Sequence, residues 1–189
     1  MNIVKKILLN FRFYYHVLVG RIVGAKHIVW YLRNPDPRLT PPLLKAFGAK
    51  IGERTTFKRT VYFDNVFEDD NSAKDFSHLE IGNNCYIGDG VYFDLASRIV
   101  LGDNVVISAR ASFVTHQDCN RSPFLNGQFP RKCGAIIVKD DSWVAFQSCI
   151  LNGVTIGPKS VVAACSLVKS NVKELSVYAG IPSKQLKSL

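Results

Sequence analysis

A six-residue hydrophobic period is the clearest pattern in the second half of the chain. Large apolar residues recur at every sixth position in three runs, namely Ile81, Ile87, Phe93, Ile99, then Leu101, Ile107, Phe113, and then Val138, Val144, Ile150, Ile156, Val162, Val168. Four positions after nearly every one stands a small or β-branched residue, such as Cys85, Ala111 or Ser148. Neither the 3.6-residue period of a helix nor the alternation of a strand produces this spacing. A fixed short period instead predicts a solenoid of stacked coils.

The period has a simple physical interpretation, which is a coil with three flat faces of six residues. The large residue fills the interior, and the small residue points inward near a corner. Corners need left-handed backbone angles, which Gly and Asn adopt easily, and suitable segments are Gly82-Asn83-Asn84, Gly88-Asp89-Gly90 and Gly102-Asp103-Asn104. One coil cannot bury its own core, so several must stack. The alternative, a β-sandwich, would instead show alternation broken by turns about every 8–12 residues.

This pattern resembles the hexapeptide-repeat acyltransferases, and among them the sugar O-acetyltransferases that act on maltose, galactosides, capsule or exopolysaccharide. The resemblance implies an all-β fold, a left-handed parallel β-helix. The handedness comes from the resemblance alone, because parallel crossovers are right-handed in about 98% of cases. It also implies a homotrimer with its active sites at the subunit interfaces.

The breaks in the period divide the chain. We expect a helical, basic N-terminal extension over 1–50, a β-helix catalytic domain over 51–175, and a C-terminal cap or tail over 176–189. Within the second part, the period fails between Phe67 and His78, where an acidic loop is expected, and a long loop covers 116–135. The segment from Val177 to Lys184 resembles the one with which the family closes its last coil.

The N-terminal extension is basic and apolar, with no acidic residue before Asp36. The spacing of its apolar residues fits one or two helices. The helical part ends at Asn34-Pro35-Asp36-Pro37, because proline does not continue a helix. Charges interrupt every apolar run, so neither a membrane span nor a signal peptide is predicted. Two interpretations stay open. In the first, the extension packs on the solenoid or on a neighbouring subunit. In the second, it lies in the headgroup region of a cytoplasmic membrane.

The amino-acid composition limits which binding partners are expected. The formal net charge is +9, but no nucleic-acid-binding motif accompanies it, so we expect no nucleic-acid partner. An anionic cofactor, an anionic glycan or a membrane surface would each be attracted by this charge. The five cysteines form no C-x-x-C pair, so neither a disulfide framework nor a zinc knuckle is indicated, and a cytoplasmic location is expected.

His116 is the candidate catalytic residue, because it follows Thr115 at the mouth of the long loop. The resemblance implies that it removes a proton from the acceptor hydroxyl, which is a weak nucleophile without a base. The alternative is a structural histidine that caps the coil. The resemblance makes Asp94 an acceptor contact, against the alternative of a solvated corner carboxylate. Asp118 is a second candidate at the acceptor side, where it either orients the imidazole or only decorates the loop.

The resemblance also implies acetyl-CoA as the donor, lying along the outside of the later coils, with no metal required. The stretch Asp140–Ala145 resembles the family's Gly-Asp-x-x-Trp-Ile-Gly, although Lys139 replaces the first Gly and Ala145 the second. Phe146 departs from the small residues usual there. Small residues let the pantetheine approach the backbone, and lysines suit its phosphates. The candidate cofactor contacts are Trp143, Ala145, Ala163, Ala164, Lys169 and Lys184, and Trp143 is equally a candidate for the core or an interface.

We therefore predict an acetyl-CoA-dependent O-acetyltransferase acting on a sugar hydroxyl, with a surface-polysaccharide, lipopolysaccharide or capsule precursor as the expected acceptor. An N-acyltransferase acting on an amino-sugar nucleotide is the first alternative, because an amine also needs a base. A zinc-dependent γ-type carbonic anhydrase would need three histidine ligands, whereas His116 is the only histidine in the regular coil region. A non-catalytic solenoid scaffold is the remaining alternative.

Overall fold

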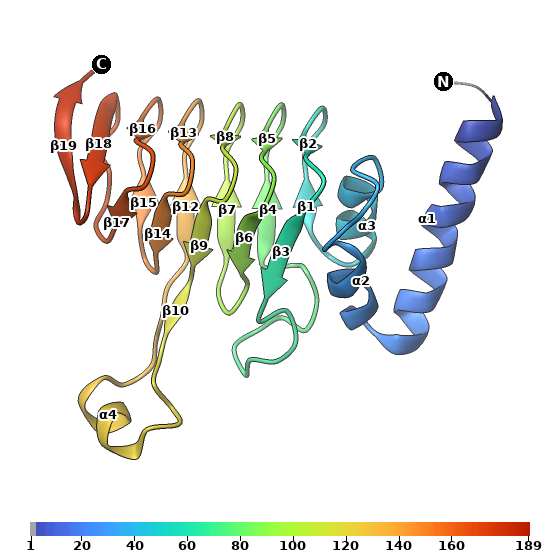
Figure 1. The fold of residues 1–189 in the computed structure, drawn as a ribbon, viewed down its shortest axis with the longest axis horizontal. Coiled ribbons are helices and arrows are strands. Elements are labelled where there is room, and N and C mark those ends of the chain that lie inside the picture. Colours follow the sequence, from blue (N-terminus) through green and yellow to red (C-terminus); the bar gives the residue numbers. More distant parts are fainter. Residues whose placement is uncertain (1–2) are drawn as a thin grey trace.

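The computed structural model describes residues 3–189, and most of this chain forms parallel sheets with few helices (Figure 1). The chain passes through three faces in a fixed order. The first face consists of β1 (Lys50–Ile51), β4 (Leu79–Ile81), β7 (Ile99–Leu101), β12 (Ile136–Val138) and β15 (Thr155–Ile156). The second begins with β2 (Thr56–Phe57), β5 (Tyr86–Ile87), β8 (Val106–Ile107), β13 (Trp143–Val144) and β16 (Val161–Val162). The third consists of β3 (Val61–Asp64), β6 (Val91–Asp94), β9 (Ser112–Val114), β14 (Cys149–Leu151) and β17 (Leu167–Val168).

Each coil pairs in parallel with the coils before and after it. On the third face, for example, Phe63 is in register with Phe93, and Phe93 with Phe113. Their rings stack inside the coils at centroid distances of 5.6 and 5.3 Å. The large residue of every hexad is buried, which confirms the expected three-sided stack. The stacked rings of Phe63, Phe93 and Phe113 fix the position along the stack axis of the residues that follow them, including Asp94 and Thr115.

The corners use left-handed backbone angles, as expected for Asn84, Gly90 and Asn104, whose φ values are 55°, 70° and 56°. Most positions in register with these take the same conformation although their residue types differ, namely Arg54, Arg110, Asp141, Gln147, Lys159 and Cys165. Register with the neighbouring coil therefore sets the corner conformation more strongly than local residue preference does.

Three helices cover the start of the stack, namely α1 (Ile3–Val23), α2 (Lys26–Tyr31) and α3 (Thr40–Ala46). One side of α1 packs on the apolar core through Leu9, Phe13 and Val17, chiefly against α2 and α3, so packing on the solenoid itself or on a neighbouring subunit stays a prediction. The other side is exposed. Within residues 3–189, no helix is both long and apolar enough to span a bilayer.

The last coil ends in an antiparallel hairpin of β18 (Ser176–Gly180) and β19 (Ser183–Ser188). Strand β18 pairs in parallel with β16 and so extends the second face, while β19 forms its outer edge. The hairpin thus covers the edge of β16, which would otherwise present unpaired backbone groups.

The long loop leaves the stack as a projecting arm, which we call the arm and which covers residues 116–133 (Figure 1). Its stem is an antiparallel pair of β10 (His116–Gln117) and β11 (Lys132–Cys133), and its tip holds the short helix α4 (Pro123–Gln128). The arm begins at the corner between the third and first faces, which we call the His116 corner.

Candidate active site

The imidazole of His116 is held against the carboxylate of Asp94. The Nδ1 atom of His116 lies 2.6 Å from Oδ2 of Asp94, and the Asp94 side chain has no exposed surface. The two residues come from successive coils, since Asp94 ends β6 and His116 begins the arm just after β9. The stacked Phe93 and Phe113 fix both positions from inside the coils.

Asp94 is saturated with hydrogen-bond donors. Its Oδ2 accepts from the backbone N–H groups of Thr115 and His116, at 2.7 and 3.0 Å. Its Oδ1 accepts from the side-chain amide of Asn65 at 2.8 Å and from the N–H of Ala96 at 3.1 Å. Burial raises the pKa of Asp94, but hydrogen bonds from the imidazole, from the Asn65 amide and from a backbone N–H outweigh it, so the pKa is lowered overall. Asp94 is therefore a buried anion at neutral pH.

This arrangement defines which nitrogen of His116 can act as a base. An ionised carboxylate only accepts hydrogen bonds, so Nδ1 must carry the proton that it donates to Asp94. In the neutral ring Nε2 is then unprotonated and available as an acceptor. The side chain of His116 is 23% exposed, so a substrate can approach the ring.

The position of Asp94 corrects the expectation that it contacts the acceptor. A side chain without exposed surface cannot reach an acceptor, and the alternative of a solvated corner carboxylate is wrong for the same reason. Asp118 is the carboxylate on the open side, with Oδ2 at 3.9 Å from Nε2 of His116. Asp94 thus orients the imidazole through Nδ1, and Asp118 faces the nitrogen that would meet the acceptor.

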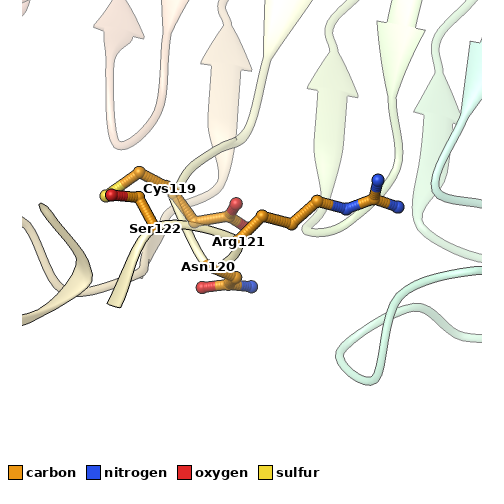
Figure 2. A pocket seen from close by; sticks show the side chains of 5 residues that line it. Cys119, Asn120, Arg121 and Ser122 are labelled. Carbon is orange, nitrogen blue, oxygen red and sulfur yellow. The ribbon is translucent and has the colours of Figure 1, made fainter. Parts of the chain in front are cut away.

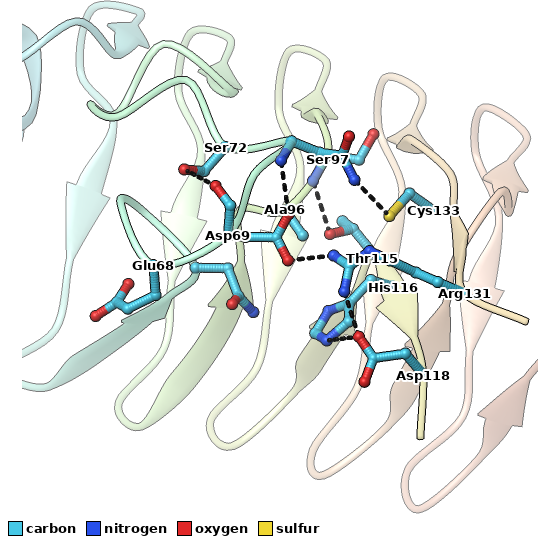
Figure 3. Close-up of polar contacts among 12 residues, drawn as sticks. Glu68, Asp69, Ser72, Ala96, Ser97, Thr115, His116, Asp118, Arg131 and Cys133 are labelled. Atoms are coloured by element: carbon cyan, nitrogen blue, oxygen red, sulfur yellow. Dashed lines mark hydrogen bonds and ion pairs between the residues drawn. The ribbon is translucent and has the colours of Figure 1, made fainter. Parts of the chain in front are cut away.

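Arg131 ties the two loops beside His116 together (Figure 3). Its guanidinium forms ion pairs with Asp118 on the arm and with Asp69 on the acidic loop between β3 and β4. A second contact joins the same segments, because the Asn71 amide lies 3.6 Å from the Cys133 sulfur. The planar guanidinium can contact two carboxylates at once, so it fixes the arm relative to the coils at the level of the imidazole.

The arm itself is hollowed next to the site. One hollow is lined by Asp118, Cys119, Asn120, Arg121 and Ser122, and Figure 2 shows the Arg121 side chain reaching away from Cys119 and Ser122. A second hollow is lined by Gln117, Asp118, Cys119, Leu125 and Phe129. Asp118 borders both hollows, so the open side of His116 continues into concave surface on the arm.

The three alanines among the cofactor candidates lie at a different corner. Ala145 and Ala163 directly follow β13 and β16, whose residues Val144 and Val162 are in register, so the two alanines stack at the corner between the second and third faces. We call this the alanine corner. Ala164 is exposed there, Ala163 is half-buried and Ala145 is buried. Such small side chains leave the backbone open to an extended ligand, which is the property that a pantetheine arm requires.

The remaining candidates divide between the two corners. Lys184 is paired with Ala179 on the end hairpin, in the same row as Ala163. Trp143 lies on the second face, half exposed, and its indole N–H donates to Ser108 Oγ at 2.9 Å. Lys169 instead follows β17 on the third face, toward the His116 corner. Within one chain, the six cofactor candidates therefore do not all lie together. The alanines also lie at a different corner from His116.

Several residues that shape the site were not predicted from the sequence. Asn65 binds Asp94 from the preceding coil, 29 positions away, and Arg131 bridges residues 62 and 13 positions away. No local pattern marks such distant partners. The one available signal was the register of Asp64 with Asp94, which places the residue after Asp64 near the site. Across residues 3–189, no group of three or more His, Cys, Asp or Glu side chains is arranged to hold a metal ion.

Comparisons with known proteins agree with this architecture. No family model matches the chain. The chain is 27% identical over 151 residues to the galactoside O-acetyltransferase of Escherichia coli K12, which covers 78% of this chain and 67% of the relative. It is also 27% identical over 141 residues to a putative colanic acid biosynthesis acetyltransferase of the same organism, covering 75% of this chain and 70% of the relative.

Solved structures lead to the same class. A hexapeptide-repeat acetyltransferase from Vibrio cholerae superposes with a TM-score of 0.73 at 22% identity and covers 92% of each chain. The same Vibrio protein has also been solved with acetyl coenzyme A, and that complex gives a TM-score of 0.59 over 87% of this chain and 85% of the other. Relatives and structural neighbours are thus hexapeptide-repeat acetyltransferases, which confirms the resemblance that the six-residue period indicates.

Proposed function

We propose that the chain is an acetyl-CoA-dependent O-acetyltransferase that transfers an acetyl group to a sugar hydroxyl. The observation that carries this proposal is the pair of His116 and Asp94, a partly exposed imidazole whose Nδ1 lies 2.6 Å from a fully buried carboxylate. A non-catalytic scaffold has no need for a buried anion behind an open imidazole. A general base that activates a hydroxyl needs both.

In this proposal Nε2 of His116 accepts the proton of the acceptor hydroxyl as its oxygen forms the new ester bond. Acetyl-CoA supplies the electrophilic thioester carbon. Asp94 stabilises the imidazolium that forms, because it lies against the Nδ1–H and stays ionised. Nε2 then returns the proton to the departing thiolate sulfur. Asp118 lies on the open side and is proposed to accept a hydrogen bond from the acceptor, since carboxylates bind sugar hydroxyls well.

We infer further that the coils are left-handed, as in the structurally similar acetyltransferases, and that the enzyme works as a homotrimer with its sites between chains. The separation of the two corners supports the second inference. His116 and the alanine corner are separated by a whole face, about six residues or roughly 20 Å of extended chain. A donor along the alanine corner of one chain would therefore meet His116 of a neighbour, as in a cyclic assembly. Lys184, in the row of Ala163, is proposed to bind its phosphates together with Lys169 of the neighbouring chain, which lies toward the His116 corner.

A surface-polysaccharide or lipopolysaccharide precursor is the acceptor class that we propose, and it is supported by the similarity to the colanic acid enzyme. Such precursors are held at membranes, so peripheral attachment to the cytoplasmic face of a membrane is part of the proposal. An amine acceptor would use the same base, but the two relatives above are an O-acetyltransferase and a polysaccharide acetyltransferase, which favours a hydroxyl.

The direct test is release of free thiol from acetyl-CoA in the presence of candidate acceptors. Neutral oligosaccharides, capsule fragments and nucleotide sugars are assayed beside their amino-sugar counterparts. We expect turnover with at least one hydroxyl acceptor and formation of an O-acetyl ester in the product. Turnover with amino sugars alone would replace the proposal by N-acylation, and absence of acetyl-CoA binding in calorimetry would favour the scaffold.

A further inference from the structure

Helix α1 has two long sides with different surroundings. The inner side is packed, because Leu9, Phe13 and Val17 contact the core and Gly20 is buried against Phe47. The outer side carries a strip of apolar side chains that are each more than 60% exposed, namely Ile7, Phe11, Tyr14, Leu18 and Ile22. Their spacings of four, three, four and four residues keep them on one side of a helix. We call this strip the outer strip of α1.

The charges on α1 indicate which kind of surface would bind the outer strip. The chain has no acidic residue before Asp36, while Lys5, Lys6, Arg12 and Arg21 lie within α1. At about 100° per residue, Arg21 lies beside one margin of the strip, whereas Arg12 and Lys5 lie farther round the helix toward its inner side, where Arg12 pairs with Asp36. An anionic surface would be attracted to α1, because the helix carries basic residues and no acidic one. A second copy of the same helix would bring like charges together, so the charges disfavour it.

The place of α1 in the fold leaves the outer strip accessible. In Figure 1, α1 is the outermost element at the N-terminal end, beyond α2 and α3, and it crosses the long axis of the strand stack. Because its inner side faces α2 and α3, the outer strip points away from the coils. A flat surface can therefore meet the whole strip without contacting the arm or the alanine corner.

We propose that the outer strip of α1 docks the enzyme on an anionic lipid bilayer. The apolar side chains enter the boundary between headgroups and acyl chains, and the positive charge of α1, with Arg21 beside the strip, attracts the anionic headgroups. This inference gives a physical surface to the membrane location within the proposed function. It stands on contacts and charges of α1 alone, so it can fail or hold separately from acetyl transfer.

Flotation of the full chain with lipid vesicles tests the proposal. The vesicles consist of phosphatidylcholine with about 30% phosphatidylglycerol, beside vesicles of phosphatidylcholine alone. We expect binding to the anionic vesicles and at least about tenfold weaker binding to the neutral ones. Raising the salt concentration from about 0.05 to about 0.5 M should weaken the binding, because ions screen the basic residues of α1.

Two double variants locate the surface. In F11S/L18S two apolar residues of the outer strip become polar, and we expect binding to anionic vesicles to fall at least about tenfold, since each buried apolar side chain contributes to insertion. The matched control, F124S/L186S, changes one Phe and one Leu that are equally exposed on the arm and the end hairpin. It should bind as the wild type does.

Three results would overturn the proposal. The wild type does not bind anionic vesicles, or the control variant loses as much binding as F11S/L18S, or F11S/L18S lowers the molar mass of the assembly in solution, which would assign the strip to a second copy of the chain. Thiol release with a soluble acceptor is measured on the same preparations. Activity that persists in F11S/L18S while vesicle binding is lost separates the docking surface from the catalytic site.

Discussion

Nδ1 of His116 lies 2.6 Å from Oδ2 of Asp94, and Asp94 also accepts the backbone N–H groups of Thr115 and His116. One buried carboxylate therefore fixes the backbone that carries the imidazole, the orientation of the ring and the nitrogen that holds its proton. In the proposed function this relationship is what lets His116 act as a general base, and it leads to separate expectations for each of the two residues.

Replacing the base should remove turnover without unfolding the protein. For His116→Ala we expect kcat to fall by about two or more orders of magnitude, the usual scale for loss of a general base. The melting temperature should change little, because the side chain is partly exposed and packs no core. Thiol release and thermal unfolding check the two parts. Activity at the wild-type level would show that another group is the base.

Asp94→Asn should reduce turnover although His116 is intact. The amide of Asn can donate to Nδ1, which would place the imidazole proton on Nε2 and remove the base, so kcat should fall by about 10²–10⁴-fold. The KM for acetyl-CoA should stay within about threefold, because Asp94 has no exposed surface with which to touch the donor. A variant that raises KM and leaves kcat unchanged would contradict the positioning role. Glu174→Gln, at an exposed carboxylate, is the control.

The same substitution should change the response of stability to acid. The pKa of Asp94 is lower in the folded chain than in the unfolded chain, so its contribution to stability is present above the unfolded pKa of about 4 and is lost as the pH falls through the folded value. The difference in melting temperature between wild type and Asp94→Asn should therefore be largest above about pH 5 and narrow below about pH 4. A difference that stays constant across that range would show that Asp94 is not ionised in the folded chain.

Arg131→Gln should loosen the arm. It removes the cation that pairs with both Asp69 and Asp118, so hydrogen exchange should increase in the arm and in the acidic loop. Misplacement of Asp118 beside Nε2 should lower kcat/KM for the acceptor by about tenfold. Arg121→Gln is the matched control for the exchange measurement, since Arg121 lies on the same arm and takes part in neither ion pair. Unchanged exchange in both loops would mean that other contacts hold the arm.

The regular part of the fold was predictable from the sequence because one physical constraint repeats. Each coil must fill the same prism, so Ile87, Phe93 and Ile99 recur at six-residue intervals and their burial follows. The corner glycines and asparagines were predictable for the same reason. The left-handed angles at Arg54, Arg110 and Lys159 were not, because they follow from register with neighbouring coils and not from residue type.

The candidate site could be predicted from the sequence only where a single residue combines a reactive side chain with a distinctive position in the repeat. His116 stands at the entry of the longer of the two interruptions, and that position suggested a functional role. The role of Asp94 was assigned wrongly, because sequence gives no measure of which side chain a coil encloses. Asn65 and Arg131 were missed since they reach the site through contacts between coils and loops that are distant in the chain.

Complementation between two inactive variants tests the central claim, that His116 of one chain acts on a donor held at the alanine corner of another. We expect His116→Ala to lack the base and Ala163→Trp to block the half-buried corner, so neither is active alone. Differently tagged copies are co-expressed, and assemblies that carry both tags are purified in two affinity steps. If the site lies between chains, one of the three sites in every mixed cyclic trimer has both wild-type residues, and activity returns to about one third of the wild-type level. Mixed assemblies that stay inactive would contradict the account, because they would place both halves of the site within a single chain.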